Sequence, residues 1–277
     1  MKLRYLFALV FLIASSSVAH ARISVVCSLF PVYDFTRQVA GTLADVKLLI
    51  PAGVDLHEYE PSPRDIITLN EADLFVYTCP ELEAWAQSLP VSATKADSSR
   101  GISLVSNDTH IWLDLSLAQT MTVNIMEALC AVDPDNALDY ARNAEDFCVR
   151  LGEIDAGFLA MKKDRPLVFA GEFSAGYFVR RYGFEYVSAY DGENEPSLRK
   201  MAEVIRHIQQ TGTRFIFTDL GAVSPVTRAI SEQTGAGILT FGTGHVVPDD
   251  RMTFTGMMTD NYNHIAEAMN DGETEGN

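Results

Sequence analysis

The sequence predicts an α/β protein of two lobes, each with a mainly parallel sheet, joined by one long connecting helix. Three observations indicate this fold. Short apolar, β-branched runs alternate with segments of helical periodicity along most of the chain. The alternation occurs in two similar halves. Between them, residues 137–163 contain no proline and repeat apolar residues at helical intervals, which predicts the connector.

The first half begins with the β-branched run 23–29, which is typical of a buried strand. Pro31 suits the first turn of the helix that follows, and apolar residues recur at helical spacing until Gly41. Further strands are expected at 46–50 and 74–78. Further helices are expected from Ser62 or Pro63 to Leu69, from Glu81 onward, and over 115–131, followed by a turn at 133–136.

The second half repeats the pattern. Its expected strands are 166–170, 186–188, 214–218 and 237–241, and its expected helices lie near 177–182, 197–208, 225–235 and 253–269. Crossovers between successive strands give a mainly parallel sheet in each half. The predicted division is therefore an N-terminal lobe at 22–135, a connecting helix at 136–163 and a C-terminal lobe at 164–277.

The N-terminus has the features of a secretory signal peptide at residues 1–21. Lys2 and Arg4 precede the apolar run 5–14, and small residues at Ala19 and Ala21 indicate cleavage after Ala21. The apolar run is shorter than the roughly 20 residues that a spanning helix needs. Cys27 lacks the small-residue context of a lipid-modified cysteine, so we expect a periplasmic protein without a lipid anchor.

The chain is strongly acidic, with a formal net charge of -16 that becomes more negative when Lys2 and Arg4 are removed. This charge argues against nucleic acid as a partner, because nucleic-acid binding requires basic patches. Cysteines in an exported chain can form disulfides, but none here lies in a CxxC pair, and buried free thiols are an equal alternative. The four are Cys27, Cys79, Cys130 and Cys148, and the pairing of the last two stays open.

Four potential metal ligands follow strands or apolar runs. His57 lies after the run 46–50, on a loop that Pro61 and Pro63 stiffen. In open α/β sheets ligands bind beyond the carboxyl ends of the strands, so loop residues at these ends can converge. The other three are His110, Glu172 and His245. A lone loop histidine is more often solvated or hydrogen-bonded than a ligand, so spacing alone supports this set only weakly.

Several motifs carry a family resemblance. They are SLFPVYD at 28–34, GVDLHEYEPSPRD at 53–65, ADLFVY at 72–77, DTHIWLD at 108–114, YG at 182–183, EPS at 195–197 and TGA at 234–236. In these segments the chain resembles the zinc/manganese-specific solute-binding proteins of ABC importers, the metal-binding family that includes adhesin-like lipoproteins. The motifs around His57 and His110 are the most specific, and the matches extend over most of the mature chain.

The resemblance implies a ligand set. It assigns the first two ligands to His57 and His110 and the third to Glu172, five residues before the aromatic Tyr177. The fourth family ligand lies on a late loop, where this chain carries His245. The alternatives for the fourth position are Asp249, Asp250 and Asp219.

The chain also departs from the family pattern. Leu56 and Thr109 stand where prolines are expected before the first two histidines, and the histidine-rich insertion of many zinc members is absent. We interpret three acidic residues as solvated or supporting charges: Glu58, Glu60 and Glu195. The two tryptophans, Trp85 and Trp112, are interpreted as core residues rather than ligand contacts.

The resemblance implies a monomeric periplasmic receptor that binds one divalent ion between its lobes and delivers it to an ABC permease. Three imidazoles and one carboxylate favour Zn²⁺, with Mn²⁺ or Fe²⁺ as alternatives. Binding should weaken below about pH 6.5, because a protonated imidazole cannot ligate. A single connecting helix predicts modest lobe motion on release.

Two other classes remain as rivals. A metallohydrolase needs an open coordination position and a general base. His57-Glu58 does not begin a His-Glu-x-x-His motif, because Pro61 stands where the second histidine would be. Four protein ligands would close a zinc site, so we expect no enzyme activity. A surface adhesin is the third class, which the expected absence of a lipid anchor disfavours.

Overall fold

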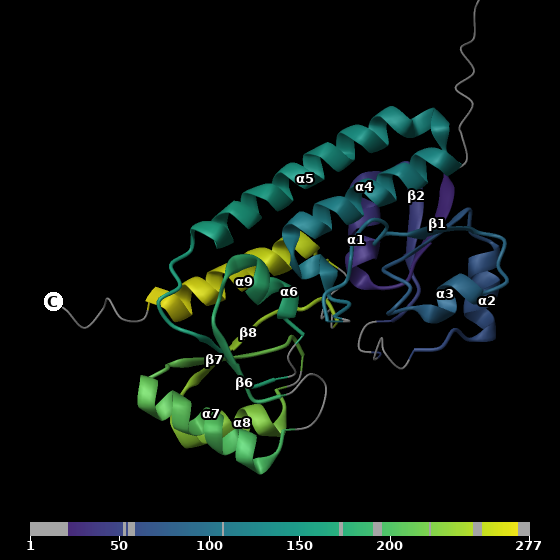
Figure 1. Cartoon of the computed structure of the whole chain (residues 1–277). Helices are drawn as coiled ribbons and strands as arrows, with labels where there is room; N and C mark the ends of the chain where they lie inside the picture. The colour runs from purple at the N-terminus through teal and green to yellow at the C-terminus, as the bar shows by residue number, and fades with distance from the viewer. Residues whose placement is uncertain are drawn as a thin grey trace, which may run out of the picture.

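The computed structural model describes residues 22–51, 54, 59–106, 108–171, 174–190, 196–221, 223–245 and 251–270. Within these residues it has the predicted fold class, with two sheets of four parallel strands each and helices between the strands (Figure 1). The predicted signal peptide, His57 and Glu172 lie outside the described residues.

The N-terminal sheet has the strand order β2-β1-β3-β4. Its strands are β1 (Ile23–Cys27), β2 (Ala44–Leu48), β3 (Leu74–Tyr77) and β4 (Thr94–Asp97). The sequence analysis missed β4, because its residues Thr-Lys-Ala-Asp contain no apolar run. It forms at the sheet edge by parallel pairing with β3, from Leu74↔Thr94 to Tyr77↔Asp97, so tertiary pairing overrides a weak local preference.

The helices of this lobe match their sequence signals. They are α1 (Phe30–Ala40), α2 (Pro63–Asn70), α3 (Ala84–Ser88) and α4 (Leu115–Val132), with a 3₁₀ turn at Ile111–Leu113. α2 begins where predicted, because Ser62 and Asp65 form a capping box and Pro63 occupies the first turn.

A buried carboxyl group supports the carboxyl edge of this sheet. Glu83 accepts hydrogen bonds from the hydroxyl of Ser28, just after β1, and from the backbone N–H groups of Thr78 (2.9 Å) and Cys79 (3.0 Å), just after β3. Burial raises the pKa of Glu83 to about 7, although these hydrogen bonds act in the opposite direction. Glu83 therefore ties together the ends of the two central strands.

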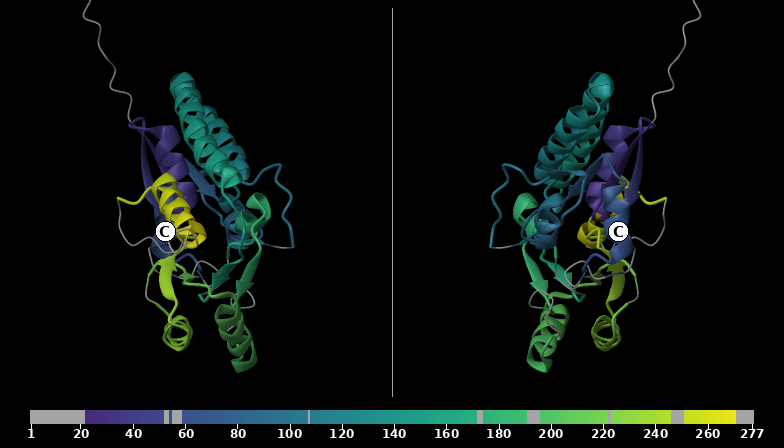
Figure 2. Two further views of the ribbon diagram at one scale, coloured as in Figure 1. Left: turned by 90° about the vertical axis from the view of Figure 1, so that its left-hand side faces the viewer. Right: turned by 90° about the vertical axis from the view of Figure 1, so that its right-hand side faces the viewer.

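The connector α5 (Ala137–Ala160) forms a hairpin with α4, and the two helices lie side by side along one side of the molecule (Figures 1 and 2). By length and composition α4 is apolar enough to cross a membrane. It packs against α1 and α5, however, and Met121, Ile125 and Leu129 lie in the core. We therefore interpret α4 as a core helix.

The C-terminal sheet has the same arrangement, with the order β6-β5-β7-β8. Its strands are β5 (Leu167–Phe169), β6 (Tyr186–Ser188), β7 (Phe215–Thr218) and β8 (Gly237–Thr240). Its helices are α6 (Gly176–Tyr182), α7 (Leu198–Thr211), α8 (Pro225–Thr234) and α9 (Phe254–Asn270). All of these elements lie within a few residues of their predicted positions.

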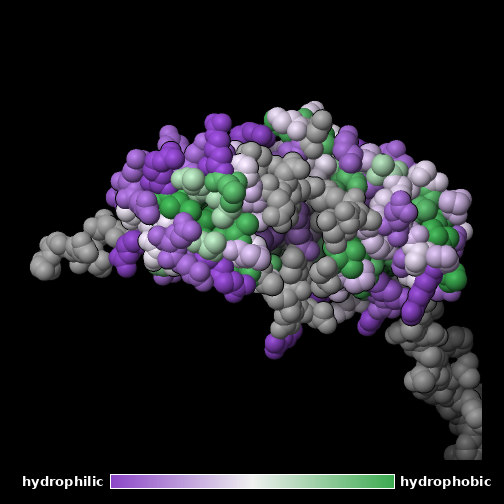
Figure 3. Space-filling view, turned by 90° about the horizontal axis from the view of Figure 1, so that it is seen from below, coloured by the Kyte–Doolittle hydropathy of each residue, from purple (hydrophilic) through white to green (hydrophobic). Residues whose placement is uncertain are grey.

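The two lobes share their main core. One cluster of buried residues runs from Val25 and Phe35 of the N-terminal lobe through Phe158 of α5 to Phe178 and Phe241 of the C-terminal lobe. Each lobe also has a smaller outer cluster of buried residues. In the N-terminal lobe it lies beneath α2 and α3, and in the C-terminal lobe beneath α7 and α8. On the face seen from below, hydrophobic side chains lie in separate patches among hydrophilic ones on both lobes (Figure 3).

Polar contacts also cross between the lobes. The buried carboxylate of Asp34 in α1 accepts a hydrogen bond from the backbone N–H of Phe254 at the start of α9 (2.8 Å). The backbone N–H of Val105 donates to the hydroxyl of Tyr177 in α6 (2.9 Å). Since α9 also packs against α5 and α1, the C-terminal segment joins the N-terminal lobe as well as its own, and the exact lobe boundaries stay a prediction.

Candidate metal centre between the lobes

His110 lies at the end of a loop that the core holds in place. It directly precedes the 3₁₀ turn Ile111–Leu113, whose three side chains are fully buried. His110 itself is 9% exposed. The histidine is therefore fixed on the surface of the shared core, although its own segment is not part of a long helix or strand.

Asp108 fixes the orientation of the His110 ring. Its Oδ1 lies 2.7 Å from Nδ1 of His110 and accepts a second hydrogen bond from the His110 backbone N–H (3.0 Å). Burial alone would raise the pKa of Asp108, but the hydrogen bonds from His110 lower it overall, which keeps the carboxylate ionised. An ionised carboxylate can only accept, so Nδ1 carries the proton and Nε2 is the nitrogen that can bind a metal.

The C-terminal lobe brings its histidine close through the turn after β8. Asn261 of α9 accepts from the backbone N–H of Gly242 (2.7 Å) and donates to its carbonyl (2.8 Å). The Thr243 hydroxyl donates to Oδ2 of Asp219 (2.6 Å), and the Thr243 N–H donates to Oδ1 (3.2 Å). His245 follows two residues later, so these contacts set the path of its backbone.

Asp219 is the partly buried carboxylate of this side. Burial raises its pKa, while the Thr243 hydroxyl, the backbone donors and the nearby His110 act in the opposite direction. Its position directly after β7, next to the loop after β8, is the arrangement expected at the carboxyl edge of a parallel sheet. In the structure Asp219 accepts hydrogen bonds from Thr243 and Leu220.

The two described histidines lie beside each other, one from each lobe. Their ring centroids are 4.7 Å apart, and the Nε2 atoms of both are buried from solvent. A zinc–nitrogen bond of about 2.0–2.1 Å places a ligating ring centroid about 3 Å from the ion. Two rings on one ion thus have centroids up to about 6 Å apart, and His110 and His245 are within this reach.

Trp112 packs against both histidines. Its ring centroid is 5.3 Å from that of His110 and 6.2 Å from that of His245. Its indole N–H donates to the carbonyl of Thr243 in the opposite lobe (2.7 Å). The sequence analysis placed Trp112 in the core, which is correct, but it missed the contacts with His245 and Thr243, because these cross between the lobes.

The remaining predicted ligands lie outside the described residues. This applies to His57, Glu172, Asp249 and Asp250. Gly171, the last described residue before Glu172, is so close to Thr218 that a Cβ on it would lie 2.7 Å from the threonine Oγ1. Among the residues that the structure does describe, no three histidine, cysteine or carboxylate side chains form a metal-binding group. The described part of the predicted site is therefore the pair His110 and His245.

The four cysteines form no metal-binding group with the other described residues. All four are free, and Cys27 and Cys79 are buried. Burial raises the pKa of both thiols to about 12, so they stay protonated at neutral pH. Cys148 lies near the carbonyl of Gln119 and Cys130 near that of Ala137. Because Gln119 and Cys130 are about 16 Å apart along α4, Cys130 and Cys148 do not pair.

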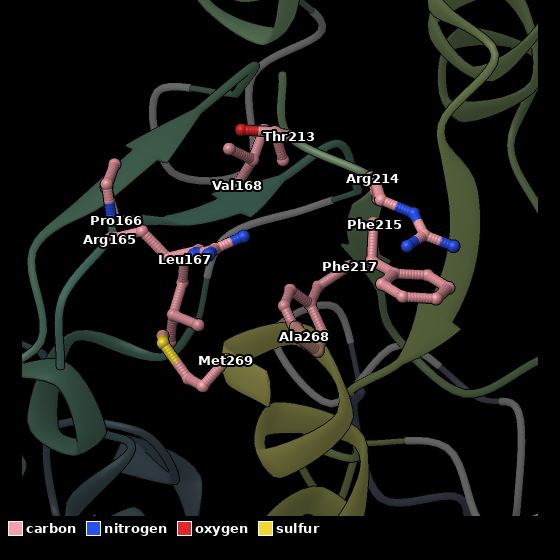
Figure 4. Close-up of a pocket in the computed structure, with 10 residues that line it drawn as sticks. All are labelled: Arg165, Pro166, Leu167, Val168, Thr213, Arg214, Phe215, Phe217, Ala268 and Met269. Atoms are coloured by element: carbon pink, nitrogen blue, oxygen red, sulfur yellow. The ribbon is translucent and has the colours of Figure 1, made fainter. Parts of the chain in front are cut away.

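A hollow in the C-terminal lobe lies at the wrong edge of the sheet for this site. It measures ≈ 260 Å³ including open solvent, and it is lined by the residues that begin β5 and β7 and by the end of α9 (Figure 4). His245 follows the carboxyl end of β8, so the hollow and the histidine pair are at opposite edges.

Comparisons with known proteins identify the family of this chain. The sequence profile of the family described as "Zinc-uptake complex component A periplasmic" matches residues 25–268. The high-affinity zinc uptake system protein ZnuA of Bacillus subtilis is 28% identical in an alignment 243 positions long that covers 78% of this chain and 76% of the relative.

Two solved structures share the fold. The metal-dependent lipoprotein YcdH from Bacillus subtilis is 27% identical with a TM-score of 0.79, over 89% of this chain and 99% of its own. A Zn(II)-bound variant of AdcAII from Streptococcus pneumoniae is 27% identical with a TM-score of 0.78, over 90% and 99% of the two chains. Since the family profile covers most of the sequence, this chain belongs to the family of periplasmic zinc-uptake component A proteins.

Proposed function

We propose that this chain is a periplasmic receptor that binds one Zn²⁺ between its lobes and delivers it to the permease of an ABC importer. The observation that supports this function most strongly is the pair His110 and His245, which come from different lobes and lie with ring centroids 4.7 Å apart. Family membership and the zinc named in its relatives point in the same direction.

The proposed ligands are His57, His110, Glu172 and His245. Asp108 supports this assignment for His110, because it leaves Nε2 as the acceptor nitrogen. Asp219 is proposed as a supporting carboxylate, because it holds Thr243 two residues before His245, and it is the alternative for the fourth ligand. A set rich in imidazole favours Zn²⁺ over the harder Mn²⁺, and Fe²⁺ is the other alternative.

Metal content tests the receptor function directly. The protein would be purified from its periplasm without tags or added metal and analysed by mass spectrometry for all transition metals. We expect one equivalent of zinc in the natural chain, and little in His110→Ala and His245→Ala. His207→Ala is the matched control, because His207 lies on α7 in the outer layer of the C-terminal lobe, and it should keep one equivalent.

Other outcomes would separate the alternatives. One equivalent of manganese or iron would keep the receptor and change its cargo. Absence of bound metal, with no uptake on titration, would contradict the proposal. The family is one of solute-binding proteins, and we propose that this member catalyses no reaction. Peptidase or esterase turnover that depends on His110 would instead support the hydrolase.

We also propose that the mature chain is monomeric, starts at Arg22 and carries no lipid, although the Bacillus relative is named a lipoprotein. The intact mass of the mature protein tests both processing and lipid attachment. Light scattering tests the monomer. Release of the ion is proposed to need only a small lobe movement, and a large change in radius between apo and metal-bound forms in solution scattering would contradict this.

A further inference from the structure

The turn that carries His245 is held by both lobes. From its own lobe, Asp219 accepts from the hydroxyl and the backbone N–H of Thr243 (2.6 and 3.2 Å). From the other lobe, the indole N–H of Trp112 donates to the carbonyl of the same residue (2.7 Å). All three polar groups of Thr243 are therefore engaged, and only one of the partners belongs to the N-terminal lobe.

The next residue shows how tightly the lobes meet at this point. Gly244 has φ +89, a conformation that favours glycine. A Cβ there would lie 3.0 Å from Cγ of Pro31 and 3.3 Å from Nε1 of Trp112. The backbone of the turn thus rests directly on α1 and on Trp112, with no room for a side chain between the lobes.

Trp112 is itself immobile in this setting. It is fully buried, and its neighbours Ile111 and Leu113 in the 3₁₀ turn are also fully buried. A buried indole N–H that lost its acceptor would be left without a hydrogen-bond partner, which is unfavourable. The contact with Thr243 is consequently specific, and the ring of Trp112 also packs against both histidines.

We propose that Trp112 is a positioning residue for the cargo site. Its indole N–H holds the carbonyl of Thr243, and through this turn it sets where His245 stands relative to His110. The hydrogen bond makes ion binding and the approach of the two lobes one event, because the C-terminal histidine reaches its place only while the turn rests on the N-terminal lobe. This inference rests on the proposed zinc function and adds a residue that does not touch the ion.

The test compares Trp112→Phe with Trp85→Phe. Phenylalanine keeps an aromatic ring but removes the N–H donor. Trp85 belongs to the outer cluster of the N-terminal lobe, where it stacks on Phe75, and it is the matched control for loss of an indole. Zinc affinity would be measured by competition with a chelating dye, and folding by thermal unfolding of the apo proteins.

We expect Trp112→Phe to weaken zinc binding about 10–100-fold, as for other partners of ligating residues, and Trp85→Phe to change it less than about 3-fold. A double-mutant cycle then separates positioning from general packing. In the His245→Ala background the Trp112→Phe effect should fall below about 3-fold, because the residue through which Trp112 acts is gone. An equal loss in both backgrounds would overturn the proposal, and so would an unchanged affinity in the single variant.

Two further measurements keep the proposal testable. Gly244→Ala disturbs the same turn and keeps the side chain of Trp112 itself. We expect it to weaken zinc binding, and it replaces Trp112→Phe as the test if that variant does not fold. If His245→Ala binds too weakly for a Kd, the visible bands of the Co²⁺ complex decide. They should shift in Trp112→Phe but not in Trp85→Phe, and unchanged bands would contradict the proposal. If the natural chain bound no metal at all, the proposed receptor function itself would be contradicted. Normal zinc binding by both the natural chain and Trp112→Phe would contradict only the positioning role of Trp112.

Discussion

The two described histidines of the candidate site are held in different ways. His110 has its supporting carboxylate two residues away, since Asp108 contacts both its ring and its backbone N–H. His245 donates its backbone N–H to the hydroxyl of Thr243 (3.4 Å), and Thr243 is in turn held by residues far away in the sequence. Asp219, 24 residues before Thr243, and Trp112, 131 residues before it, both hydrogen-bond to Thr243, and the Trp112 ring also packs against His245.

This difference indicates separate roles for the lobes. The N-terminal lobe presents a ring whose orientation is set locally, so His110 stays ready to bind whatever the other lobe does. The C-terminal lobe presents a ring whose place depends on contact with the N-terminal lobe. Substitutions near His110 should therefore change the affinity of one ligand, whereas those near His245 should change how the two halves of the site meet.

The largest expected effect is loss of a ligand. His110→Ala should lower zinc affinity by more than about 100-fold, since removal of a ligand exceeds the 10–100-fold effect of removing a supporting partner. His245→Ala should cost less than His110→Ala, because the locally supported half of the site remains intact. Chelator competition at pH 7.5 measures both, and a larger loss in His245→Ala would reverse the assignment of roles.

The next effect comes from the partner of His110. Asp108→Ala should weaken zinc binding about 10–100-fold, because the ring loses the acceptor that fixes its tautomer. Asp108→Asn keeps an acceptor oxygen and should cost less. Equal affinity in Asp108→Ala and the natural chain, measured by the same competition, would show that His110 needs no such support.

A smaller effect is expected at Thr243. Thr243→Val removes the hydroxyl that donates to Asp219 but keeps the backbone N–H and the carbonyl that Trp112 holds. We expect a loss of zinc affinity of up to about 10-fold and of stability of about 1 kcal/mol, because the partly buried Asp219 loses one of its donors. Thr259→Val on the exposed side of α9 is the control, and denaturant unfolding of the apo proteins gives the stability. A loss as large as that of His245→Ala would mean that Asp219 does more than hold the turn.

The smallest effect on zinc binding is expected at Glu83, where the prediction concerns the pH dependence of stability. Burial raises the pKa of Glu83 from 4.5 to about 7, so the folded protein binds this proton more tightly than the unfolded chain. The stabilisation from this proton is fully present below about pH 4.5 and is lost as the pH rises to about 7. The free energy of unfolding falls by at most about 3 kcal/mol over this range.

Glu83→Gln should flatten this part of the pH profile. The glutamine can keep the network, because its oxygen can accept from the N–H groups of Thr78 and Cys79 while its amide faces the hydroxyl of Ser28. Chemical unfolding of both apo proteins between pH 4.5 and 7.5 measures the difference. Parallel pH profiles would show that Glu83 ionises in the folded state at its ordinary pKa.

Most of the fold was predictable because local signals and tertiary structure agree. Ser62 and Pro63 start α2, and Gly183 and Gly235 lie where α6 and α8 end. β4 was missed because pairing with β3, rather than its own residues, makes it a strand. Local periodicity does not encode such edge strands.

The site was predictable to a lesser extent. His110 and His245 were identified from their loops and from family resemblance, and the structure places the two rings side by side. The Asp108-x-His110 spacing carries a local signal for the ring partner. The contacts of Thr243 with Asp219 and Trp112 carry none, because the partners lie 24 and 131 residues apart in sequence and meet only in the folded protein.

The most direct test of the central claim is the position of the ion. Crystals of the zinc-loaded protein would be measured on both sides of the zinc absorption edge. We predict one anomalous peak between the lobes, about 2.0–2.1 Å from Nε2 of both His110 and His245. A single peak elsewhere, at a cysteine sulfur or at His207 or His264, would contradict the claim that these two histidines join the lobes around the cargo.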